Sequence, residues 1–87
     1  MASRKNLKKT VNFIVEEIVT DCLVQQALKD TDEKKVDEVL ADVLSLQNEF
    51  LSRANHTEPN NVKAFYKDFY TDFNAGVDAI YAKIEAF

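Results

Sequence analysis

The segment VKAFYKDFYTDFNAGVDAIYAKIEAF, residues 62–87, decides the fold of this chain. Large apolar side chains recur in it at helical spacing, at Val62, Phe65, Phe69, Phe73, Val77, Ile80 and Ile84. That spacing of three or four residues places them on one face of an α-helix. Gly76, the only glycine in the chain, either permits the close approach of another helix or breaks the segment. Because the apolar spacing passes through the glycine unshifted, we expect one continuous or slightly kinked helix. A third helix split near Gly76, with a fourth after it, is the alternative.

Two further amphipathic stretches precede this segment, at Leu7 to Leu28 and at Glu33 to Ala54. The first break, residues 30–33, offers three candidate helix caps. Asp30 with Glu33 three residues later resembles a capping box, and Thr31 or Asp32 could equally cap. The second break, residues 55–61, contains a proline and three asparagines, which favour loops and turns.

Two short connections between three helices force neighbouring helices to run antiparallel. The sequence therefore predicts an all-α fold, an antiparallel up-down-up three-helix bundle that occupies residues 1–87 as a single domain. On the outer side of the second helix, Glu49 and Arg53 stand at i,i+4, a spacing that indicates a solvent-facing pair. The apolar arc of the first helix is unusually broad, since Phe13, Val19 and Val24 widen it. Such an arc needs two neighbouring helices or another subunit to cover it.

The charge is distributed unevenly along the chain. The net charge is −4, but the first nine residues hold four cations and no anion: Arg4, Lys5, Lys8 and Lys9. We expect residues 1–6 to form a frayed basic arm, which acts either as a solubilising tail or as a contact for an anion. The remaining residues hold seven cations and fifteen anions, a balance of −8 that repels nucleic acid over most of the surface.

The chain offers few residues for chemistry. His56 is the only histidine and Cys22 the only cysteine, whereas zinc sites and catalytic sites need several converging groups. Cys22 lies on the apolar stripe of the first helix, beside Asp21, which favours core packing over a reactive thiolate. The Glu-x-x-His pattern of di-iron carboxylate bundles does not occur. We therefore expect no catalytic residue, no metal, no cofactor and no small-molecule substrate, and we do not expect an enzyme.

Aromatic side chains concentrate at the end of the chain, where seven of the nine aromatics lie: Phe65, Tyr66, Phe69, Tyr70, Phe73, Tyr81 and Phe87. The phenylalanines are typical of a core. The tyrosines flank that core, and tyrosine is enriched at protein interfaces because its apolar ring carries a polar tip. We predict a protein contact surface made by Phe13, Val19, Tyr66, Tyr70 and Tyr81. The alternative is that all five belong to the core or its rim.

This pattern favours a non-enzymatic helical module that associates with itself, most simply as a dimer, or binds another protein. The other hypothesis is a nucleic-acid accessory protein that uses Arg4, Lys5, Lys8 and Lys9. It predicts binding that weakens steeply with salt.

The N-terminal sequence Ser3-Arg4-Lys5-Asn6-Leu7-Lys8-Lys9 precedes an acidic, valine-rich stretch that contains Asp21-Cys22. Over about the first quarter of the chain this resembles a family of small uncharacterised helical proteins from Bacteroidetes. The resemblance implies a bacterial setting and carries no activity or site residues with it.

No apolar run in the sequence reaches the roughly 18 residues that span a bilayer. With no secretory pattern and a single cysteine, we expect a cytoplasmic protein.

Overall fold

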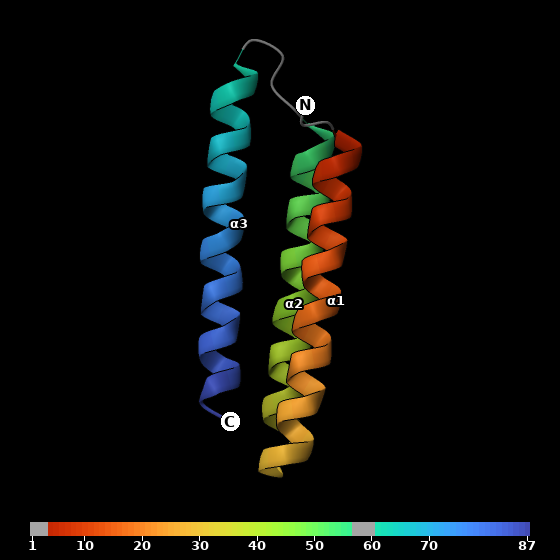
Figure 1. Cartoon of the computed structure of the whole chain (residues 1–87), viewed down its shortest axis with the longest axis vertical. Coiled ribbons are helices and arrows are strands. Elements are labelled where there is room, and N and C mark those ends of the chain that lie inside the picture. The colour runs from red at the N-terminus through yellow and green to blue at the C-terminus, as the bar shows by residue number, and fades with distance from the viewer. Residues whose placement is uncertain (1–3, 57–60) are drawn as a thin grey trace.

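The computed structural model describes residues 4–56 and 61–87, which form three α-helices. Helix α1 spans Arg4–Lys29, α2 spans Glu33–Asn55 and α3 spans Val62–Glu85. The chain runs down α1, up α2 and down α3, and the described ranges contain no strand (Figure 1). The predicted all-α, antiparallel up-down-up three-helix bundle is confirmed.

Helix α1 begins three residues earlier than its apolar pattern indicates. Residues 4–6, which the sequence placed in a frayed basic arm, belong to the helix, and residues 1–3 lie outside the described residues. Arg and Lys have good helix propensity, and Leu7 is fully buried one turn into the helix. Its burial anchors the first turn, so Lys5 and Asn6 extend α1 instead of preceding it.

The turn between α1 and α2 is built from local hydrogen bonds. Asp30 adopts a left-handed conformation with φ of 52°, which aspartate tolerates better than most residues. The Thr31 N–H then donates to the Gln26 carbonyl at 3.3 Å, as in a Schellman motif. Of the three candidate caps for α2, the structure uses Asp32, whose Oδ1 accepts from the Lys34 N–H at 3.2 Å. The turn is short enough to keep α1 and α2 side by side.

Helix α3 is one unbroken helix through Gly76, so the alternative of a split third helix is wrong. A Cβ atom at Gly76 would lie 2.6 Å from Cδ1 of Leu46 on α2. The glycine therefore lets α2 and α3 approach closely at this level, which explains why α3 carries a residue of poor helix propensity in its interior.

The core runs the length of an elongated bundle, 49 by 18 by 17 Å. Each helix contributes one buried stripe, and the buried side chains are Leu7, Val11, Val15, Ile18, Cys22, Val36, Val39, Val43, Leu46, Phe50, Ala54, Phe69, Phe73, Ile80 and Ile84. Cys22 is fully buried among them, as its position on the apolar stripe predicts. Each of the three helices in the described residues keeps a long outer face in solvent.

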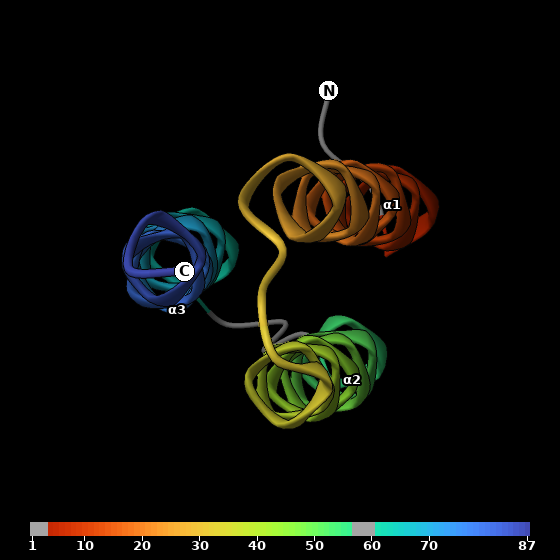
Figure 2. The same ribbon diagram turned by 90° about the horizontal axis from the view of Figure 1, so that it is seen from below.

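The three helices do not pack equally. Seen end on, the three helices lie at the corners of a triangle (Figure 2). Helices α1 and α2 contact each other most extensively, α3 contacts α2 less, and α1 and α3 contact each other least. Large aromatic side chains bridge the distance to α3. The Phe50 ring lies edge-on to Phe69 at 5.2 Å and to Phe73 at 5.1 Å between ring centroids. The Arg53 guanidinium lies over the Phe50 ring at 4.8 Å and covers this aromatic cluster from solvent.

We expect Phe69→Ala to lower the free energy of unfolding by about 3–5 kcal/mol, because it empties a fully buried aromatic site in the middle of the bundle. The matched control is Phe13→Ala, the same substitution at an exposed phenylalanine, which should change the stability by less than about 0.5 kcal/mol. Urea unfolding followed by circular dichroism at low protein concentration measures both. Equal losses at the two positions would contradict this assignment of the core.

Candidate interaction surface

Exposed apolar side chains concentrate on α1. Four of the six large apolar residues that are exposed in the described part of the chain lie on this helix: Phe13, Leu23, Val24 and Leu28. Phe13 is 60% exposed and Leu28 is 76% exposed. The other two, Leu44 and Val62, are isolated on α2 and α3. Single exposed apolar residues are ordinary, but a group on one helix is typical of a contact surface.

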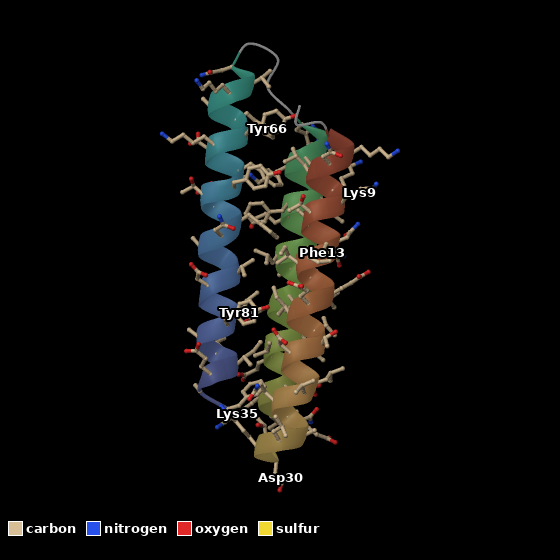
Figure 3. All side chains as sticks on the ribbon, viewed as in Figure 1. Lys9, Phe13, Asp30, Lys35, Tyr66 and Tyr81 are labelled. Carbon is tan, nitrogen blue, oxygen red and sulfur yellow. The ribbon has the colours of Figure 1, made fainter. Side chains whose placement is uncertain are left out.

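Phe13 stands beside a shallow depression on the outer side of α1. The depression is lined by Phe13, Glu16, Glu17, Thr20 and Asp21, so an apolar ring borders a group of three carboxylates. Lys9 lies one helical turn before Phe13 (Figure 3). Moving along this face from the N-terminal end, the charge therefore changes from positive to negative across Phe13.

The five residues predicted as a contact surface differ in their exposure to solvent. Phe13 is exposed, whereas Val19 and the three tyrosines are half-buried and pack against the core. Tyr66 and Tyr70 lie against Phe65 and Phe69 in edge-to-face contacts. These four residues form the rim of the core, as the alternative to a contact surface predicted. That they also contact a partner stays a prediction.

Tyr81 ties α3 to α1. Its side chain lies on the side of α3 that faces the other helices, and its hydroxyl donates to Asp21 Oδ2 at 3.1 Å (Figure 3). Burial, and then the hydrogen bond to the Asp21 carboxylate and its negative charge, raise the pKa of Tyr81 above the ordinary value of about 10. Folding favours the neutral phenol, so this contribution to stability is complete below about pH 10 and is lost as the pH rises through the raised pKa.

We expect Asp21→Asn to lower the pKa of Tyr81, while burial keeps it above the ordinary value. The matched control is Glu16→Gln, which neutralises a carboxylate on the same helix that does not contact Tyr81. The pH titration of the Tyr81 ¹³Cζ resonance by NMR measures the shift. Unchanged Tyr81 titration in Asp21→Asn would show that the two side chains do not meet in solution.

The predicted basic residues lie at the N-terminal end of α1. Lys5 and Lys9 are exposed and Lys8 is half-buried, and Arg4 is the first residue of the helix. The first turn of α1 carries no acidic residue, so these cations stand where the helix dipole favours anions. Their use as a nucleic-acid contact stays a prediction.

Several ion pairs and hydrogen bonds join the helices at the edges of the core. Arg53 on α2 pairs with Asp72 on α3 at 3.0 Å, not with Glu49 on its own helix. Lys83 on α3 pairs with Asp42 on α2, and this hydrogen bond raises the pKa of the lysine. Both pairs are largely exposed, so they align α3 more than they stabilise it. The sequence gives no signal for them, because pairs between helices depend on the rotation of each helix.

The residues considered for chemistry do not converge. His56 is exposed at the end of α2, where its backbone N–H donates to the Arg53 carbonyl at 3.1 Å. It borders a depression lined by Ser52, Arg53, His56, Asn61, Ala64, Phe65 and Asp68. Burial raises the pKa of the Cys22 thiol, which opposes its reaction as a thiolate. In residues 4–56 and 61–87, no group of three His, Cys, Asp or Glu side chains is placed to hold a metal ion.

Among the described helices, none has an apolar stretch long enough to cross a membrane. Comparisons with protein-family models, with curated proteins and with solved structures each find no match to this chain. The resemblance to small helical proteins of Bacteroidetes therefore stays a prediction.

Proposed function

We propose that this chain is a non-enzymatic protein-interaction module that associates through the outer face of α1, with itself or with another protein. The observation that carries the proposal is the exposure of Phe13 on a helix whose opposite side is buried in the core. Phenylalanine at 60% exposure leaves a large apolar area in water. Covering that area in a complex is favourable, and aromatic anchors near the centre of an interface contribute much of the binding energy.

The surroundings of Phe13 support a protein contact in preference to a nucleic-acid contact. Glu16, Glu17 and Asp21 border the ring, and their negative charge repels a phosphate backbone. Apolar side chains ringed by charged groups are typical of protein interfaces, where the rim is polar and the centre apolar. The tyrosine edge of α3 supports the proposal less than the sequence suggested, because its rings pack against the core.

We place this module in a bacterial cytoplasm. The resemblance of the N-terminal quarter supports the bacterial setting. A single cysteine buried in the core is compatible with a reducing compartment, because it does not depend on a disulfide.

Phe13→Asp should weaken association at least about tenfold, because it puts a charge where an apolar ring is covered. Leu44→Asp is a close control, since it introduces the same charged residue in place of a large apolar side chain at a similarly exposed position on α2, 58% against 60%. Light scattering across a concentration series measures both. We expect the wild-type mass to rise from 9.9 kDa towards twice that value, Leu44→Asp to follow it, and Phe13→Asp to remain monomeric.

Equal behaviour of the two variants would show that α1 does not provide the contact. A wild-type chain that remains monomeric at every concentration would exclude self-association.

A further inference from the structure

Five exposed side chains form an inclined ridge that winds around the solvent side of α1 and ends beside α3, where the last of them accepts the hydrogen bond from Tyr81. They succeed one another at i,i+4, the spacing at which side chains on a helix are neighbours. In order, this α1 ridge contains Lys5, Lys9, Phe13, Glu17 and Asp21. Two cations precede the aromatic ring and two anions follow it at equal intervals. The charge of the ridge is thus positive before Phe13 and negative after it.

We propose that two copies of the chain associate through their α1 ridges, antiparallel and centred on Phe13, with the two helices crossed at about −50° so that the inclined ridges meet. Reversing a second copy about Phe13 sets Lys5 opposite Asp21 of the second copy, and Lys9 opposite Glu17 of the second copy. Two-fold symmetry repeats both pairs, so four opposite-charge pairs surround the two phenylalanine rings. This inference rests on the proposed function, since it names the partner and the geometry for the same surface.

In a single copy of the chain, like charges on the ridge repel each other. Lys5 and Lys9 are like charges at i,i+4, and so are Glu17 and Asp21, an arrangement that destabilises a helix. The lysines also stand near the positive end of the helix dipole. An antiparallel second copy brings its two carboxylates to that end and its two lysines to Glu17 and Asp21. It therefore relieves both repulsions and the mismatch with the dipole.

The depression beside Phe13 suits the side chain that this pairing brings to it. Lys9 of the second copy lies next to Glu17, where its methylene stem can cover the Phe13 ring while its ammonium group meets the carboxylates. Asp21 keeps its hydrogen bond to Tyr81 and remains exposed, so it can accept from a lysine as well. The contact thus combines an apolar centre with a charged rim.

The charges also select the register. A contact centred further along α1, which places Phe13 against Val24 of the second copy, covers two exposed apolar side chains. That register, however, sets Glu16 opposite Asp21 of the second copy, two like charges, and leaves Lys9 against Leu28. A parallel contact sets each lysine against the same lysine. Among these arrangements, only the antiparallel contact centred on Phe13 pairs every charge of the ridge with its opposite.

Charge reversal tests the pairing directly. Lys5→Glu/Lys9→Glu makes the ridge entirely acidic, and Glu17→Lys/Asp21→Lys makes it entirely basic. At low ionic strength, where charges are least screened, each double variant should dimerise at least about tenfold more weakly than the wild type. An equimolar mixture of the two should form a heterodimer again. The quadruple variant carries all four changes and restores the complementarity within one chain, so it should dimerise within about threefold of the wild type.

Sedimentation velocity over a concentration series measures these dissociation constants, and circular dichroism checks that each variant keeps its helices. A contact between single helices is smaller than the roughly 800 Å² per partner of stable complexes, so the series should extend to high concentration. If the double variants dimerise as well as the wild type while Phe13→Asp does not, the antiparallel pairing is wrong and the proposed function stands. If the wild type never dimerises, both the pairing and self-association are wrong.

Discussion

The contact between Phe50 and the two phenylalanines Phe69 and Phe73 holds the bundle together as three helices. Helices α1 and α2 are joined by a tight turn and pack closely, but α3 follows a longer connection and lies further from α1. Edge-to-face rings at 5.1 and 5.2 Å fill the space between α2 and α3. All three rings are almost fully buried, so the position of α3 depends on how they fit together. About one helical turn beyond Phe73, Gly76 lets the Leu46 side chain of α2 lie directly against the backbone of α3.

Once α3 is held in place, the surface of α1 is determined. One side of α1 is buried by α2 and by the rings and aliphatic side chains of α3, and Tyr81 fixes the rotation of α3 against it through Asp21. Within residues 4–56 and 61–87, no third element covers the opposite side of α1. Its broad apolar arc, which the sequence shows, is therefore only partly covered, and Phe13, Val24 and Leu28 remain in solvent. The same helix thus supplies part of the core and the surface for which we propose an interaction.

The sequence predicts the fold well because helical periodicity and two short breaks determine most of it. The apolar spacing through Gly76 correctly indicated a continuous α3, and Cys22 on the apolar stripe was correctly placed in the core. The contact surface was predicted less accurately, because the tyrosines pack against the core. In the sequence, a row of tyrosines beside a row of phenylalanines looks the same whether the tyrosines face solvent or a neighbouring helix. The rotation of α3 decides between these two, and it depends on contacts such as Arg53 with Asp72 that span two helices. The charge order along the α1 ridge, by contrast, is fully visible in the sequence. The structure adds that all five side chains are exposed, so that they are available to a second copy.

The antiparallel arrangement of two α1 helices is tested most directly by a distance between the two copies. A nitroxide label at Ala27→Cys, an exposed position 14 residues from Phe13, reports it by pulsed electron resonance, and the buried Cys22 thiol does not compete for the label. At 1.5 Å per residue, an antiparallel pair centred on Phe13 places the two labelled positions about 42 Å apart. A parallel pair places them about 10 Å apart, the usual distance between packed helices. A distribution near the longer distance supports the account, and one near the shorter distance contradicts it.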